Sequence, residues 1–223
     1  MSNSTSRVTR IIRWAAVSGG LGLVIFGLSG RWGDPWLWAY VMVFAAVGLY
    51  PALLLDDDLA RERFHPPDAG ADPVPLRVIR LVALGHVIVG ALDTGRWHLT
   101  HVPDALRLIG LAGMAVMLPL IFRAMMVNRF FSAVVRIQRD RGHRVVDQGP
   151  YAIVRHPGYV GMITAIPFGA LVLGSWLGFA LSLVYAGLML RRVVFEDAFL
   201  RSNLEGYAQY ASRVRYRLLP GVW

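Results

Sequence analysis

The sequence predicts an all-α protein of the membrane, a polytopic helical bundle with about six transmembrane helices, or five if one hairpin does not cross fully. The first observation is composition: 56% of the 223 residues are hydrophobic and 17% are charged. This is more apolar than an ordinary soluble domain. The second is a series of apolar runs close to the roughly 20 residues that a bilayer-spanning helix needs. The third is that the arginines flank these runs instead of interrupting them.

The apolar runs divide the chain in order. The predicted spans are residues 14–30, 35–55, 76–92, 105–127, 159–173 and 176–190. A tight turn joins the first two, and residues 56–75, which hold three consecutive aspartates and four prolines, predict a water-facing loop. Residues 128–155 form the longest polar connection. The last two spans are short and form a hairpin through Gly174 and Ser175, with a kink expected at Pro167.

The C-terminal part from residue 191 predicts one amphipathic helix on the cytoplasmic membrane surface, followed by an extended tail. We therefore expect two parts of one integrated domain. Residues 1–127 form the N-terminal, acceptor-side helices, and residues 128–223 form the cofactor-binding part. The N-terminal arginines before an apolar run also fit a secretory signal peptide, although Ala15-Ala16 is a poor cleavage site.

The arginines predict the orientation. All 23 basic residues are arginine, a usage typical of a GC-rich bacterial genome, and 20 of them fall on the side that holds both termini. Cytoplasmic loops carry such an excess, so we expect a multi-pass protein of the cell inner membrane with both termini in the cytoplasm. The net charge of +9 then favours contact with anionic lipids, and not with nucleic acid, because the basic residues flank membrane spans.

No metal site is expected. The chain has no cysteine, which excludes thiolate ligands and cysteine nucleophiles. His98, His101 and Asp104 lie three residues apart in an external connection, but no fourth ligand is visible. A flexible polar loop is the simpler interpretation.

The segment from Gly149 to Gly161, GPYAIVRHPGYVG, is the most distinctive candidate for chemistry. Its prolines and glycines fix an exposed backbone, while Arg155 and His156 supply donors at the entry of a helix. The alternative is a turn followed by an interfacial anchor. Upstream, residues 128–132, Asn-Arg-Phe-Phe-Ser, line the acceptor entrance or serve as another such anchor.

A second cluster follows the last span. Arg192 and Glu196 are four residues apart, and Tyr207 and Tyr210 are three apart, so each pair shares a helical face. A carboxylate at the bilayer edge is energetically costly unless it pairs with another group or has a function. A solvated amphipathic helix with tyrosines in the headgroup belt is the alternative.

Together the two clusters resemble one family pattern: Gly-Pro-Tyr, Arg-His-Pro-x-Tyr, an apolar hairpin, Arg-x-x-x-Glu, Glu-x-Tyr-x-x-Tyr and a terminal basic stretch with proline. This order is similar to the isoprenylcysteine carboxyl methyltransferase family and the related phospholipid N-methyltransferases. The resemblance covers residues 143–223. It implies an S-adenosylmethionine-dependent methyltransferase whose C-terminal part folds over the cofactor at the membrane surface. A lipophilic or small acceptor then enters from the bilayer.

The resemblance also implies residue roles. Tyr151, His156, Pro157, Tyr159, Glu196, Tyr207 and Tyr210 are the expected cofactor-binding residues, with Glu196 at a polar end of the cofactor and the last two tyrosines closing the pocket. Arg155, His156, Arg192 and Glu196 are the catalytic candidates. Either arginine can hold the carboxylate of the acceptor or that of the cofactor.

The favoured reaction is carboxylate O-methylation, which needs no general base because the nucleophile is already an anion. An amine acceptor, as in phospholipid N-methylation, needs one, and His156 or Glu196 can serve. The pattern is also compatible with an NADPH-dependent sterol-type reductase, or with a non-catalytic membrane scaffold or sensor.

Overall fold

The computed structural model describes residues 7–72 and 76–223, and all regular structure in these two ranges is helical. The long helices are α1 (Arg7–Ser29), α2 (Pro35–Leu54), α4 (Leu76–Leu92), α5 (Asp104–Val127), α6 (Pro157–Leu173) and α7 (Trp176–Asn203). The short elements are α3 (Asp57–Phe64), the π-helical turn η1 (Asp93–Trp97), the 3-10 turns η2 (Arg139–Arg141) and η3 (Gly149–Ala152), and α8 (Tyr207–Arg213). The predicted helical class is confirmed.

The helices have the surface of a membrane protein. Within the described ranges, α1, α2, α5 and α7 are long and apolar enough to cross a membrane, and α6 is a shorter apolar helix. Large apolar side chains such as Leu23, Met42 and Val116 are more than 60% exposed, as expected where lipid is the solvent. The helix α4 has 17 residues, with Arg77 and Arg80 near its start. The expected count of six spans therefore stays a prediction.

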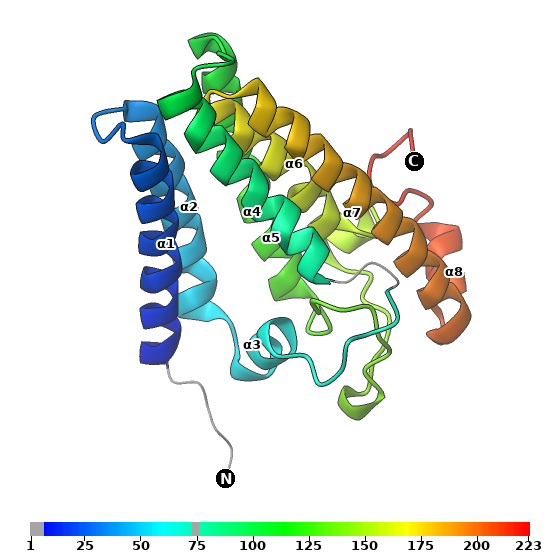
Figure 1. The fold of residues 1–223 in the computed structure, drawn as a ribbon. Coiled ribbons are helices and arrows are strands. Elements are labelled where there is room, and N and C mark those ends of the chain that lie inside the picture. Colours follow the sequence, from blue (N-terminus) through cyan, green and yellow to red (C-terminus); the bar gives the residue numbers. More distant parts are fainter. Residues whose placement is uncertain (1–6, 73–75) are drawn as a thin grey trace.

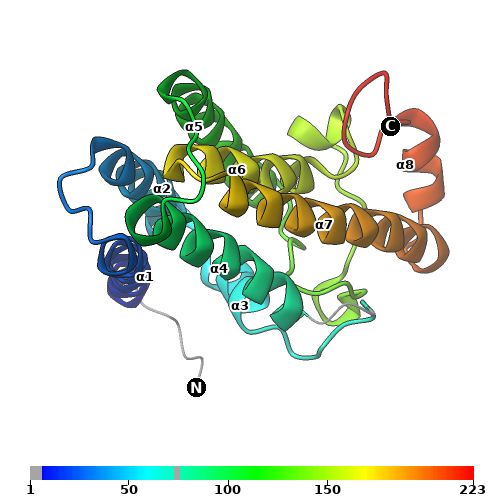
Figure 2. The ribbon, with the colours of Figure 1, turned by 45° about the horizontal axis from the view of Figure 1, so that its top comes forward.

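Figure 1 shows α1 and α2 as a neighbouring pair beside a slanted stack of α4, α5, α6 and α7. The turns between α1 and α2 and between α6 and α7 lie at one end of this bundle. The helix α3 and the connection 128–156 lie at the other end, with α8 to one side (Figure 2). A buried apolar cluster joins the pair to the stack through side chains that include Phe26, Leu37, Val87, Met114 and Leu173.

Glycines allow α5 and α6 to pack at close range, the most extensive helix contact in the fold. A Cβ atom on Gly161 would lie 2.7 Å from the carbonyl oxygen of Met117, and one on Gly110 would lie 2.7 Å from that of Phe168. Real Cβ atoms do not approach backbone oxygens so closely. The two helices therefore cannot keep this separation with larger residues at either position.

We expect Gly161→Ala to destabilise the protein by about 1–3 kcal/mol, because the added methyl group overpacks a backbone contact. Thermal unfolding in detergent micelles measures this effect. The matched control is Gly187→Ala in α7, where a Cβ would meet nothing within 4 Å. An unchanged melting temperature for the Gly161 variant, equal to that of the control, would refute the close contact.

The C-terminal region differs from the sequence prediction. Instead of ending near residue 190, α7 continues as one helix of 28 residues to Asn203, so a separate surface helix beginning at residue 191 is wrong. The short helix α8 lines one side of the pocket described below, and a non-helical tail follows it. Arg192 and Glu196 thus sit on the same rigid helix as the apolar residues of the hairpin.

Two polar connections are also more ordered than predicted. The 56–75 stretch contains the helix α3. Asp56 caps its start by accepting hydrogen bonds from the amides of Asp58 (2.7 Å) and Leu59 (3.1 Å). Residues 73–75 of this stretch lie outside the described ranges. At the opposite end of the bundle, the fully buried Asp93 accepts hydrogen bonds from the amides of Leu99 and Thr100, so the connection expected to be flexible is anchored.

Candidate active site

A cavity of about 220 Å³, partly open to solvent, lies where the 128–156 connection meets α3, α4, α6, α7 and α8. Of the nine residues predicted from the sequence, eight line it: Tyr151, Arg155, His156, Tyr159, Arg192, Glu196, Tyr207 and Tyr210. The ninth, Pro157, is a buried residue at the start of α6, where its fixed φ suits the first helical turn. Asn128, Phe130, Phe131 and Ser132 line the same cavity.

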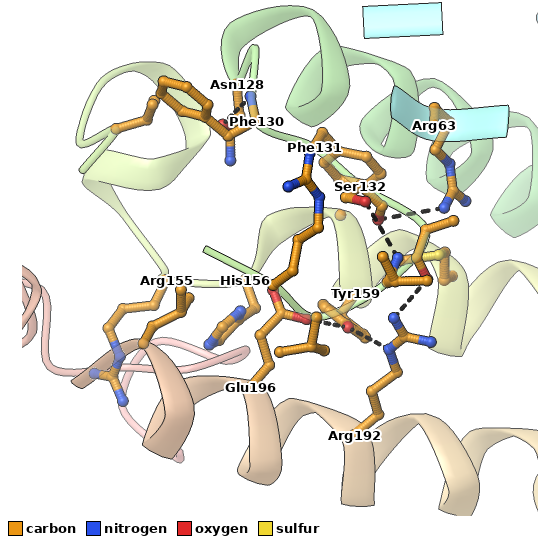
Figure 3. Close-up of a pocket in the computed structure, with 18 of the residues that line it drawn as sticks. Arg63, Asn128, Phe130, Phe131, Ser132, Arg155, His156, Tyr159, Arg192 and Glu196 are labelled. Carbon is orange, nitrogen blue, oxygen red and sulfur yellow. Dashed lines mark hydrogen bonds between the residues drawn. The ribbon is translucent and has the colours of Figure 1, made fainter. Parts of the chain in front are cut away.

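Tyr159, Glu196 and Arg192 form a hydrogen-bonded group on the cavity wall (Figure 3). The Tyr159 hydroxyl donates to Glu196, and the Arg192 Nε donates to the Tyr159 oxygen over 3.0 Å. A second nitrogen of Arg192 donates to the carbonyl of Ala133 over 2.6 Å. This chain of contacts ties α6, α7 and the 128–156 connection together. It also holds the Glu196 carboxylate at the cavity.

Asp197, one residue further along α7, organises the other side of the site. It is fully buried and accepts hydrogen bonds from Arg155 (2.7 and 3.1 Å), Tyr207 (3.0 Å) and Arg217 (3.0 Å). His156 lies 3.3 Å from the same carboxylate. No motif of the sequence marks Asp197 as functional. Its only sequence signal is a second carboxylate beside Glu196, in a helix that continues from a membrane span.

Arg155 holds the C-terminal tail in place. Besides the two bonds to Asp197, its guanidinium donates to the carbonyls of Val214 (2.8 Å) and Arg215 (2.7 Å). Its backbone amide donates to the carbonyl of Tyr216, and that of His156 donates to the carbonyl of Arg217. With four donations already made by its side chain, Arg155 acts here as a positioning residue. Binding of a ligand carboxylate by Arg155 stays a prediction.

The two tyrosines of α8 present their rings to the cavity. The hydroxyl of Tyr207 donates to Asp197, and that of Tyr210 donates to the carbonyl of Tyr151 over 2.7 Å. The rings stand edge to face, with centroids 5.5 Å apart. Burial raises the pKa of Tyr207, and the neighbouring Asp197 raises it further, so this phenol stays protonated.

His143 gives the cavity a neutral imidazole. Its ring packs at a tilt against the ring of Phe130, with centroids 4.6 Å apart, and it accepts a hydrogen bond from the amide of Gln138. Burial lowers the pKa of His143 to about 4, and the positive charges of Arg136 and Arg141 contribute. The imidazole is therefore uncharged near pH 7 and is available as a hydrogen-bonding group without adding positive charge.

The helix α3 is bound to the 128–156 connection at the cavity. Glu62 is buried and accepts hydrogen bonds from Arg136 (2.6 and 3.0 Å) and from the hydroxyl of Ser132 (2.7 Å). Burial alone would raise the pKa of Glu62, but these hydrogen bonds outweigh it and hold the pKa below its ordinary value. Asp58 pairs with Arg141 over 2.5 Å. Asp58 of the aspartate run thus contacts the arginine-rich connection instead of facing water alone.

Metal binding finds no support in the described ranges, where no group of three or more histidine, cysteine, aspartate or glutamate side chains is placed to hold an ion. The walls of the cavity carry carboxylate, guanidinium, imidazole and phenol groups. Two carboxylates of the site, Glu196 and Asp197, are adjacent in sequence and face different partners. Asp197 is enclosed by cations, and Glu196 is at the cavity surface.

Comparisons with known proteins agree with this arrangement. Residues 109–202 match the model of the isoprenylcysteine carboxyl methyltransferase family. A protein-S-isoprenylcysteine O-methyltransferase of Schizosaccharomyces pombe is 36% identical over 86 residues, 38% of this chain and 36% of that protein. A probable protein-S-isoprenylcysteine O-methyltransferase of Oryza sativa subsp. indica is 32% identical over 89 residues, 39% of this chain and 47% of that protein. The aligned segments thus span less than half of either relative.

The solved structure of a eukaryotic intramembrane Ras methyltransferase, an isoprenylcysteine carboxyl methyltransferase, aligns with 96% of this chain and 76% of its own. The TM-score is 0.61 at 18% sequence identity, which shows a shared fold. Fold and cavity together define a multi-pass helical membrane protein with a ligand pocket at one end of its bundle. Residues 109–202, which include all of α6 and nearly all of α7, are similar to the isoprenylcysteine carboxyl methyltransferase family.

Proposed function

We propose that this protein is a membrane-embedded S-adenosylmethionine-dependent methyltransferase that methylates the carboxylate of a lipophilic or small acceptor. The observation that carries the proposal is that Tyr159, Glu196 and Tyr207, from three different helices, share one cavity. The family match covers the first two of these positions. The relatives named above are methyltransferases of isoprenylcysteine, which supports the same reaction class here.

The residues of the cavity fit this cofactor. S-adenosylmethionine supplies a methyl group on a sulfonium, together with an adenine ring and a charged amino acid end. Glu196 offers a half-buried carboxylate to a cation, and the rings of Tyr207 and Tyr210 offer stacking surface. Tyr151 and His156 complete this side of the pocket. During methyl transfer, the positive charge of the sulfonium disperses in the transition state. The main task of the protein is therefore to align the acceptor with the methyl group and to exclude water.

The proposal also includes the orientation of the protein in the membrane and the lipids that it contacts. The cavity lies at the end of the bundle that carries the arginine-rich connection, α3 and α8 (Figure 1). We place this end in the cytoplasm of the cell, at the inner membrane, with both termini on that side. Exposed arginines such as Arg191, Arg201 and Arg213 then face anionic lipid headgroups.

The test is equilibrium binding of labelled S-adenosylmethionine to the full chain in lipid nanodiscs, followed by incubation with lipid extract and mass spectrometry for transferred label. We expect saturable binding and a base-labile methyl ester product. A base-stable methylamine product would assign the protein to the N-methyltransferases instead. Binding of NADPH without binding of S-adenosylmethionine would identify a reductase, and binding of neither would favour a scaffold or sensor.

A further inference from the structure

A second cavity lies at the end of the bundle opposite the candidate active site (Figure 1). It has a volume of about 510 Å³ and is partly open to solvent. Its lining comes from the turn between α1 and α2, from η1 and the residues that follow it, from the start of α5 and from the turn between α6 and α7. The proposed methyl transfer uses none of these residues, and only Gly174 among them falls within the family match.

Arg107 is the buried cation of this second cavity. Its side chain is only 6% exposed, its Nε donates to the carbonyl of Val172 over 3.1 Å, and its Cζ lies 5.1 Å from the centre of the Trp36 ring. Its Nη2 has no hydrogen-bond partner within the described part of the chain, and the carboxylate of Asp34 lies 3.7 Å from it. A buried N–H group without an acceptor is costly, and an acceptor on a ligand removes that cost.

The backbone at Gly174 leaves room for the guanidinium of Arg107. Gly174 ends α6 with a φ of 84°, in the left-handed region that favours glycine. A Cβ atom at this position would lie 3.1 Å from Cζ of Arg107. The tight turn between α6 and α7 thus keeps Arg107 at the cavity wall.

The charges of the second cavity favour a ligand that carries both signs. The lining holds two cations and two anions, and its two histidines carry no formal charge at pH 7; these residues are Arg31, Arg107, Asp34, Asp104, His98 and His101. An anionic ligand would therefore leave one negative charge in excess. A zwitterion brings an anion to Arg107 and a cation to Asp104, whose side chain is 73% exposed, and leaves the net charge unchanged.

This end of the protein has the composition of a membrane interface. Five of the seven tryptophans of the chain lie in the turns and helix starts around the cavity: Trp32, Trp36, Trp38, Trp97 and Trp176. All but Trp36 are at least 38% exposed. Tryptophan is enriched at the level of the lipid headgroups. The cavity therefore opens where headgroups lie.

Apolar side chains continue from the cavity toward the bilayer core. Leu99 lines the cavity and is 69% exposed. Leu108 is 59% exposed and lies four residues after Asp104, on the same face of α5 and one turn further along the helix. A molecule with a charged head in the cavity thus has apolar surface beside it for a hydrocarbon chain.

We propose that this second cavity binds the headgroup of a phospholipid that carries a phosphate and a primary ammonium. The phosphate accepts hydrogen bonds from Arg107, and the ammonium donates to Asp104. The acyl chains lie along Leu99 and Leu108. Because the lining comes from four separate segments of the chain, the bound lipid joins them and stabilises the folded bundle. The site is separate from the proposed methyl transfer and does not depend on it.

The test titrates the full chain, freed of lipid in detergent micelles, with a short-chain phosphatidylethanolamine and with a phosphatidylglycerol of the same acyl chains. Native mass spectrometry measures the bound lipid. We expect the ethanolamine lipid to bind at least about tenfold more tightly, the difference expected for one contact to a charged group. Asp104→Asn should abolish this preference and leave the fold intact, because the side chain is exposed. Glu205→Gln, an exposed carboxylate outside the cavity, is the matched control and should keep the preference.

The phosphate contact is tested with Arg107→Gln. Because both lipids carry a phosphate, this variant should bind both about tenfold more weakly. Arg96→Gln is the matched control, since Arg96 lies at the same end of the protein, is exposed and does not line the cavity. The melting temperature of each variant without lipid reports whether the fold is intact, and the Asp104 comparison decides the proposal if Arg107→Gln does not fold.

A third probe, glycerophosphoethanolamine, carries the headgroup without acyl chains. It should bind at least about tenfold more weakly than the lipid, because it buries no hydrocarbon. Equal affinity for this probe and the lipid would identify a soluble phosphate ester as the ligand and overturn the assignment to a phospholipid. The proposal also fails if the two lipids bind equally, if phosphatidylglycerol binds more tightly, if neither lipid binds, or if Asp104→Asn keeps the preference.

Discussion

Asp197→Asn is expected to destabilise the protein by about 3–5 kcal/mol, because it leaves a buried cation without its counter-ion. Asp197 is 0% exposed and Arg155 only 4%. The substitution keeps the shape of the side chain but removes the charge that Arg155, Arg217 and Arg201 share. Since Arg155 also binds the carbonyls of residues 214 and 215, the C-terminal tail should loosen. Chemical unfolding in mixed micelles and limited proteolysis of the tail measure the two effects.

The matched control for this prediction is Asp147→Asn. Asp147 pairs with Arg213 over 3.1 Å, but both side chains are largely exposed, so the pair contributes at most about 1 kcal/mol. Equal stability of the two variants would mean that Asp197 does not hold the site together. A destabilised Asp197 variant with a protease-resistant tail would separate the two roles and show that Arg155 anchors the tail without its carboxylate partner.

Glu196→Gln is expected to weaken binding of S-adenosylmethionine about 10- to 100-fold, the range for losing a hydrogen bond or ion contact to a charged group. The amide can still accept the hydrogen bond from Tyr159, so the fold should be preserved. What disappears is the negative charge facing a cationic cofactor. Equilibrium dialysis with labelled cofactor gives the affinity, and the melting temperature reports whether the fold is intact.

Glu205→Gln is the control for Glu196, because Glu205 lies just beyond the end of α7, is exposed and does not line the cavity. It loses the same charge from the same region of the chain, so any general effect of net charge appears in both variants. If Glu196→Gln bound the cofactor as tightly as the control, the carboxylate of Glu196 would have no part in holding it.

The helical scaffold was predictable because the bilayer imposes a simple length and hydropathy pattern. The predicted 35–55 and 76–92 spans agree with α2 and α4 to within one residue at either end. The end of α7 was not predictable in this way. Hydropathy falls at Arg191, but the helix continues because Arg192 and Asp197 find partners on the 128–156 connection.

The candidate site was predictable where its residues form a local pattern, and not where they depend on distant contacts. Tyr159 and Glu196 stand in spaced motifs with recognisable chemistry, and the structure places both at the cavity. Arg63 also lines the cavity but stands in no motif. Its position at the cavity depends on the docking of α3, which Glu62 and Arg136 fix across 74 residues of sequence. Pairings of such long range are not visible in a single sequence.

Mapping the bound cofactor tests the central claim most directly, namely that residues 143–210 enclose S-adenosylmethionine. Ultraviolet cross-linking of labelled cofactor to the full chain in nanodiscs, followed by peptide sequencing, identifies the contact residues. We predict label on the peptides that contain Tyr151 and His156 and on those that contain Glu196, Tyr207 and Tyr210, with excess unlabelled cofactor preventing it. Label confined to α1 and α2, or label that excess cofactor does not displace, would contradict this placement of the cofactor.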